Sequence, residues 1–336
     1  MLYRLKSVLF VSFLVMFTLI SSARDYNIGD IETFWQLDVL KAEKVLADGY
    51  YMADFQCIRK GKYSYVFLER ALPDDKVPDI DFVDKLFVFF EQIYPKLTDY
   101  FGPPSDLDKN ERFSILIADI RDWFYYDVNT KFEAQPIQGY YSFELNLKDK
   151  KDFLTMDVKQ SIVDAYGTLA NQYFKNIFEN ANPNPDIPKD RAIQEALAHI
   201  SIFLAGTVDR DSYIQWQISI LKKDLEKGKL LNPFDSTYDY LDIQNPDIHH
   251  CYAAGYFFMY YIINRILSDR HEKREFIYSL IYEKINSDSY TKIMNSLIKS
   301  RIILDERSFN IFYRNNFKEF LLEFLGIQDN SLIQNN

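Results

Sequence analysis

The sequence predicts an α+β protein with a β-rich N-terminal lobe and a mostly helical C-terminal lobe. Three segments near the N-terminus are rich in aromatic and β-branched residues and are separated by turn residues, which predicts a small antiparallel sheet (residues 33–40, 50–58 and 63–69). After Gly206, apolar residues recur at helical spacing almost to the end of the chain. Two long helices, residues 161–179 and 190–206, lie between these regions, and the rest of the chain is organised around them.

Length and composition limit the possible functions. The chain has 336 residues, enough for one large domain or two, and is unusually aromatic, with 25 Tyr and 28 Phe. A formal charge of −10 argues against a general attraction to nucleic acid or to an anionic lipid surface. The sequence has no G-x-S-x-G motif and no phosphate-binding glycine loop, so it lacks the signatures of serine hydrolases and of nucleotide-binding proteins.

The first 23 residues have the three parts of a secretory signal. Arg4 and Lys6 provide a positive start, residues 7–20 are apolar, and small residues precede a cleavage point after Ala23. We therefore expect an exported protein, periplasmic or extracellular, with an uncleaved N-terminal membrane anchor as the alternative. No later stretch is apolar enough to span a bilayer, so no transmembrane segment is expected after cleavage.

Two cysteines, Cys57 and Cys251, occur in this exported chain. An oxidising compartment permits a disulfide between them. Each lies in a strongly apolar stretch, however, and free cysteine is among the most buried residue types. We expect two buried free thiols, with a bridge as the alternative.

The middle of the chain predicts one long helix and two strands. Asp79 is suited to cap a helix over residues 80–101, which Pro95 should kink or divide and Gly102 should end. Two strand-like segments follow, a central strand and then an edge strand or turn (residues 113–120 and 139–143).

The second half of the chain is predicted to be helical. The proline-rich residues 182–188 should link the two long helices, because proline cannot continue a helix. Five further helices are expected (residues 211–227, 252–267, 274–286, 290–299 and 308–325). We expect an N-terminal lobe over residues 24–180, a helical lobe over residues 181–327 and a frayed tail over residues 328–336.

The two long helices carry a degenerate form of a zinc-peptidase pattern. In such enzymes H-E-x-x-H places two histidines on one helical face, and a glutamate from a second helix completes the metal site. Here the second helix has Glu195, while the H-E-x-x-H positions read Asn171-Gln172-Tyr173-Phe174-Lys175. Further short segments match in the same order along the chain (residues 28–30, 33–35, 93–102, 115–122, 138–142 and 252–258). The chain thus resembles the hyicolysin family of zinc metallopeptidases, of the gluzincin type whose third zinc ligand is glutamate.

The resemblance implies that this chain has lost the zinc site. The first zinc histidine falls on Asn171, the general-base glutamate on Gln172, the second histidine on Lys175 and the third ligand on Glu195. Asparagine is a poor zinc ligand, glutamine cannot take a proton from water, and a lysine places a positive charge where the metal would lie. We therefore expect no zinc, no other cofactor and no catalytic residues.

Lys175 has two possible roles at this position. Its ammonium could form a buried ion pair with Glu195, with Asn171 and Gln172 donating further hydrogen bonds to the carboxylate. Alternatively, it could point to solvent on an amphipathic helix.

A replacement metal site is a less favoured alternative. Glu195 and His199 are four residues apart on one helix and share a face, and His249 or His250 could complete a site. The simpler interpretation is that His199 is a half-buried or surface helix residue and that His249 and His250 lie in a loop. A separate acidic segment with Asp119, Asp122 and Asp127 lacks the spacing of a calcium loop and is expected to be solvated.

We expect an exported, catalytically inactive metallopeptidase homologue that acts as an extracytoplasmic binding or scaffold protein. Its partner would be a protein, peptide or glycan of the cell envelope, and tyrosines could line a groove for it (Tyr125, Tyr126, Tyr140, Tyr141, Tyr238 and Tyr240). The alternative is an active metallopeptidase with an unorthodox metal site that uses Glu195 and His199.

Overall fold

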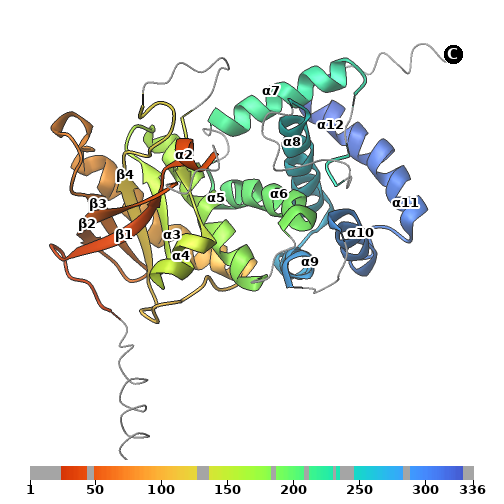
Figure 1. Cartoon of the computed structure of the whole chain (residues 1–336). Helices are drawn as coiled ribbons and strands as arrows, with labels where there is room; N and C mark the ends of the chain where they lie inside the picture. Colours follow the sequence, from red (N-terminus) through yellow and green to blue (C-terminus); the bar gives the residue numbers. More distant parts are fainter. Residues whose placement is uncertain are drawn as a thin grey trace, which may run out of the picture. The chain divides into compact units, whose positions relative to one another are not determined.

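A computed structural model of the chain describes eight segments (residues 24–43, 49–126, 136–182, 187–207, 212–229, 232–234, 246–282 and 288–327; Figure 1). The expected signal segment, the expected tail, Asp127, Tyr238 and Tyr240 lie outside the described residues. The predicted α+β class is confirmed, because the strands precede most of the helices in the chain.

Six strands form one sheet in the order β1-β2-β3-β4-β6-β5. Their bounds are β1 Ile31–Leu37, β2 Tyr50–Lys60, β3 Ser64–Glu69, β4 Phe113–Ala118, β5 Gly139–Tyr140 and β6 Phe153–Asp157. β1 pairs antiparallel with β2, and β2 with β3, while β3 runs parallel to β4. The expected antiparallel start, the central strand β4 and the edge strand β5 are therefore confirmed.

Helices follow one another through most of the second half of the chain. The bounds are α2 Val39–Glu43, η1 Asp74–Lys76, α3 Ile80–Phe101, α4 Phe143–Asp149, α5 Ile162–Ala181, α6 Ile187–Ala205, α7 Ser212–Glu226, α8 Pro246–Tyr261, η2 Ile262–Ile266, α9 Arg270–Tyr282, α10 Ser289–Lys299, α11 Glu306–Ile311, η3 Phe312–Phe317 and α12 Lys318–Leu325. η1 is a 3-10 helix, whereas η2 and η3 are π-helical.

The chain forms two compact units that do not follow its linear order. Unit 1 comprises the described parts of Met1–Val77, Asp106–Pro136 and Ser142–Thr155. Unit 2 comprises the described parts of Pro78–Ser105, Ile137–Tyr141 and Met156–Asn336. The boundary expected near residue 180 stays a prediction.

The core of unit 1 is built from aromatic side chains of the strands. Phe34 is fully buried and has edge-to-face contacts with Phe55, Phe67 and Phe153, with ring centroids 5.6, 5.3 and 5.2 Å away. Such edge-to-face pairs are favourable beyond the area that they bury. These contacts explain why the aromatic N-terminal segments predict a sheet.

The core of unit 2 is a set of packed helices. α5 packs against α3 and α6, and α6 packs against α8, so that α6 lies between α5 and α8 (Figure 1). Tyr173 and Phe174 of α5 are fully buried against Phe90 and Phe101 of α3, with centroid distances of 5.1 and 4.7 Å. Ser161 caps the start of α5 by accepting a hydrogen bond from the backbone N–H of Asp164.

Prolines interrupt fewer helices than expected. α3 begins after the predicted cap Asp79 and ends at Gly102, but Pro95 does not divide it. The buried face of α3 continues on both sides of Pro95, and this packing outweighs the local cost of proline, about 3 kcal/mol. α6 includes Pro188, which the linker prediction excluded, because proline is tolerated in the first turn of a helix.

α8 also begins earlier than expected, at Pro246. His249 and His250 therefore lie in a helix, and the expectation that they form a loop is wrong. Proline at the first helical position is the physical reason, because its missing N–H has no partner there in any helix.

Four elements were not predicted: α2, η1, α4 and β6. β6 lies inside the sheet between β4 and β5, and all five of its residues are buried. A strand that is buried on both faces shows no alternation of polar and apolar residues. Lysines and an aspartate directly before β6 further obscure its pattern.

The cysteines and acidic residues of the middle segment are buried. Cys57 and Cys251 are buried free thiols, in agreement with the favoured expectation. Asp119 and Asp122 are only 4% and 2% exposed, so the expectation of a solvated loop is wrong for both. Asp119 pairs with Lys76, and Asp122 accepts hydrogen bonds from the backbone N–H groups of two following residues.

Candidate functional site

α5 and α6 bring Lys175 and Glu195 together. The Nζ atom of Lys175 lies 3.1 Å from Oε1 of Glu195, and their side chains are 17% and 8% exposed. The predicted ion pair is thus confirmed, and the alternative in which Lys175 points to solvent is wrong. The two residues lie on packed helices of unit 2. The resemblance assigns Lys175 to the second zinc histidine and Glu195 to the third zinc ligand.

A second cation, Arg191, reaches the same carboxylate. Its Nη2 atom lies 3.0 Å from Oε1 of Glu195, one helical turn away on α6. Oε1 of Glu195 is buried, and neither cation makes a hydrogen bond of good geometry to it. The two contacts are therefore electrostatic. Sequence reasoning missed Arg191, although its spacing of four residues from Glu195 is the ordinary signal of an ion pair on a helix.

The two amides do not act as expected. Gln172 donates from Nε2 to Oδ1 of Asn171 at 3.2 Å, and its Oε1 accepts the backbone N–H of Tyr141 at 3.0 Å. The expectation that Asn171 and Gln172 donate to Glu195 is therefore wrong. The second group that compensates Glu195 is Arg191, whose guanidinium brings a positive charge to the carboxylate.

The charges determine the protonation of Glu195. Burial by itself would raise its pKa, but Lys175 and Arg191 outweigh burial and hold the pKa at about 2. Burial lowers the pKa of Lys175, against the opposing effect of Glu195. Charge therefore outweighs burial for Glu195 but not for Lys175. The cause is that the carboxylate faces two cations, whereas Lys175 shares that one carboxylate with Arg191. Glu195 is the better compensated partner and is ionised at neutral pH.

A further carboxylate and an amide extend this network. Gln194 donates to Oε1 of Glu179 at 3.3 Å and accepts from Nη1 of Arg191 at 3.3 Å. Burial raises the pKa of Glu179. Together with Lys175 and Glu195, these residues form the polar centre, which we define as Lys175, Glu179, Arg191, Gln194 and Glu195.

The histidines of the alternative metal site are held by other groups. His199 is 2% exposed, with Nδ1 2.6 Å from the backbone oxygen of Glu195 and Nε2 3.2 Å from the side-chain Nε2 of Gln217. Because Gln217 Nε2 is a donor, His199 Nε2 accepts and Nδ1 donates to the carbonyl. Burial lowers the pKa of His199 to about 4, so the ring is neutral.

The other two histidines have different surroundings. His249 has an edge-to-face contact with Trp216, with ring centroids 5.0 Å apart, and His250 pairs through Nδ1 with Asp224. In the described part of the chain, Glu195 and these histidines do not come together as a set of three metal-ligand atoms.

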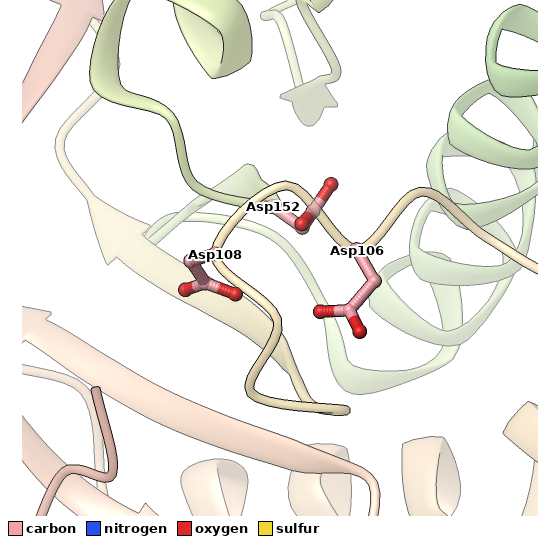
Figure 2. Close-up of side chains that lie close together, drawn as sticks. All are labelled: Asp106, Asp108 and Asp152. Atoms are coloured by element: carbon pink, nitrogen blue, oxygen red, sulfur yellow. The ribbon is translucent and has the colours of Figure 1, made fainter. Parts of the chain in front are cut away.

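One acidic cluster in unit 1 was missed. Asp106, Asp108 and Asp152 each offer a carboxylate oxygen within 4.8 Å of the others (Figure 2). Asp106, Asp108 and Asn110 stand at alternate positions, a spacing that could have drawn attention to this loop. Burial, followed by the charge of Asp152, raises the pKa of Asp108 to about 7.

The cluster is used to hold its own loop. Asp108 accepts from the Nδ2 of Asn110 at 2.7 Å, Asp106 accepts the backbone N–H of Glu111 at 3.3 Å, and Asp152 accepts that of Leu107. These bonds stabilise the turn that leads into β4.

The polar centre does not fit a zinc ion. Zinc would need deprotonated nitrogen, sulfur or oxygen ligands at about 2.0–2.3 Å. Glu195 is such a ligand, but Lys175 and Arg191 already place two cationic nitrogens on its oxygen. The arrangement can hold charge and orient α5 against α6.

Comparison with known proteins gives a likeness in structure alone. No family model matches the chain, and no curated protein matches it in sequence. Its structure is similar to the M1 zinc metallopeptidase from Deinococcus radiodurans, with a TM-score of 0.41 at 11% identity, over 80% of this chain and 58% of that chain. A glutamate-to-alanine variant of that enzyme gives a TM-score of 0.42 at 11% identity, over 88% and 61%. The chain therefore spans about three fifths of the length of these structures.

No helix within the described segments is long and apolar enough to cross a membrane.

Proposed function

We propose that this chain is an exported, non-catalytic relative of the zinc metallopeptidases that acts as a binding or scaffold protein outside the cytoplasm. The proposal joins the family resemblance of the sequence to one observation, the ion pair between Lys175 and Glu195 at 3.1 Å. At the positions that the resemblance assigns to the second zinc histidine and to the third zinc ligand, the chain has a lysine and a glutamate that form an ion pair.

The ion pair supports loss of catalysis for a chemical reason. Peptide hydrolysis by a zinc enzyme needs a metal with an open position for water and a base to accept its proton. Gln172 stands at the position of the base, and its side-chain oxygen accepts the backbone N–H of Tyr141. An amide cannot serve as a general base at neutral pH, so both requirements fail at the same site.

The competing function is an active metallopeptidase with an unorthodox site that uses Glu195 and His199. The two differ in metal content. We expect protein purified without chelators to contain far less than one zinc per chain and to release no fragments from an unstructured substrate such as casein. Stoichiometric zinc that is lost in Glu195→Gln or in His199→Ala, together with zinc-dependent hydrolysis, would establish the enzyme and overturn the proposal.

Export and binding need their own measurements. N-terminal sequencing of the protein from the native envelope should give Arg24 as the first residue, whereas an intact Met1 in the membrane fraction would indicate an anchor. The immobilised chain should then be probed with arrays of peptides and envelope glycans. Saturable binding of one class supports a binding module. Stable association with the envelope without such binding supports a scaffold.

A further inference from the structure

Lys175 and Arg191 come from different helices and meet at one carboxylate oxygen. Lys175 lies on α5 and Arg191 on α6, and their terminal nitrogens are 3.1 and 3.0 Å from Oε1 of Glu195. Each side chain is largely covered, with 17% and 26% of its surface exposed. Two monovalent cations thus occupy the surroundings of the oxygen that would bind one divalent ion.

We propose that Arg191, together with Lys175, replaces the divalent cation charge for charge and that Arg191 by itself excludes zinc from the site. The inference rests on the proposed function, because it takes the α5–α6 frame as a former metal site. It adds a specificity-determining residue that lies outside the H-E-x-x-H positions. It also implies that restoring those positions does not restore metal binding.

The exclusion follows from geometry and from the chemistry of arginine. A zinc ion bound to Oε1 would sit about 2.0–2.2 Å from that oxygen, which leaves the Nη2 atom of Arg191 within a few ångströms of a doubly charged ion. A lysine can lose its proton when a metal competes for the site, but a guanidinium stays charged. The repulsion is strong in a covered site, where water screens it poorly.

Contacts around Arg191 keep the guanidinium in this place. Nη1 donates to Oε1 of Gln194 at 3.3 Å, and the hydroxyl of Tyr252 is a further hydrogen-bond partner. Gln194 is itself 4% exposed and bound to Glu179. Movement of Arg191 away from Glu195 would therefore break several contacts of the polar centre.

The experiment compares four chains in their affinity for Zn²⁺, measured by competition with a chromophoric chelator. These are the wild type, the restored chain Asn171→His/Gln172→Glu/Lys175→His, the restored chain with Arg191→Gln, and the restored chain with Arg307→Gln. Arg307 is exposed on α11 and serves as the matched control for loss of one arginine. We expect Arg191→Gln to tighten zinc binding of the restored chain by at least about 100-fold, and Arg307→Gln to leave it unchanged.

The outcomes separate the inference from the proposed function. Equal affinity of the restored chain with and without Arg191→Gln overturns the inference and leaves the proposed function standing. If no restored chain binds zinc, the helix pair is not a former zinc site. If the wild type contains stoichiometric zinc, the metal site is intact. Either of these results overturns the proposed function.

Folding of each chain is checked by circular dichroism. If the triple replacement prevents folding, the same comparison is made with Lys175→His and Lys175→His/Arg191→Gln, which change fewer buried groups. The chain with Arg191→Gln should again bind zinc more tightly, and equal affinities would contradict the inference.

Discussion

The side chains of Lys175 and Glu195 meet between the packed helices α5 and α6, with Nζ of Lys175 3.1 Å from Oε1 of Glu195. Arg191, which lies on α6 like Glu195, approaches the same oxygen. A buried carboxylate that shares two cations differs from a simple ion pair. Loss of one cation leaves the carboxylate compensated by the other, whereas loss of the carboxylate leaves two cations close together. Loss of Glu195 should therefore cost more stability than loss of either cation.

We predict that Glu195→Gln destabilises the protein more than Lys175→Met does. Breaking one side of a well-buried pair costs about 3–5 kcal/mol, and Glu195→Gln should fall in this range. Lys175→Met should cost about 1–2 kcal/mol, because Arg191 still neutralises Glu195. Urea denaturation of both variants and of the double variant gives the coupling energy. Additive losses would mean that the two residues do not interact.

The stability of the protein should fall in acid because of Glu195. Its pKa is about 2 in the folded protein, lowered from 4.5, so the folded state binds fewer protons than the unfolded state between these values. The stabilisation is present above pH 4.5 and is lost as the pH falls toward 2, by on the order of 3 kcal/mol. The difference in unfolding free energy between wild type and Glu195→Gln should shrink over this range. A difference that is independent of pH would contradict the assignment.

Asp108 should have the opposite effect on stability. Its pKa is raised from 3.8 to about 7, so the folded state retains a proton that the unfolded state has released. Stability from this group falls as the pH rises from about 4 to 7. Asp108→Asn should therefore stabilise the protein at pH 8 by on the order of 1–2 kcal/mol, and much less at pH 4. Denaturation of wild type and Asp108→Asn at both pH values tests this, and an equal difference at pH 4 and pH 8 would contradict the assignment.

Gly102 should not tolerate a side chain. It ends α3 with φ at +101°, and a Cβ atom there would lie 1.9 Å from the hydroxyl oxygen of Tyr282. That hydroxyl donates to the backbone oxygen of Phe101 at 3.0 Å, so it is not free to move. Gly102→Ala should cost more than about 2 kcal/mol through clash and backbone strain together.

Gly228→Ala is the matched control for Gly102→Ala. Gly228 has φ at +70°, but no atom lies within 4 Å of a Cβ placed there. Its replacement should cost only the backbone strain, about 1 kcal/mol. Thermal denaturation of the two variants separates the effects, and equal losses would show that the contact with Tyr282 does not matter.

Local patterns in the sequence were sufficient for much of the fold. Asp79 and Gly102 mark the two ends of α3, and the aromatic N-terminal segments predict the strands of the sheet. Both signals are local, because helix caps and side-chain periodicity depend on neighbours in the chain. The pairing of Lys175 with Glu195 was one of the two roles that the sequence left open for Lys175, and the structure decided between them.

Only the tertiary structure decided which groups share a buried environment. Arg191 could be paired with Glu195 by spacing, but its competition with Lys175 for one oxygen depends on how α5 packs against α6. The high pKa of Asp108 depends on Asp152, which is 44 positions away in the chain, and β6 has no pattern because both of its faces are buried. Burial and electrostatic interaction are set by distance in space, and the order of residues does not contain that distance.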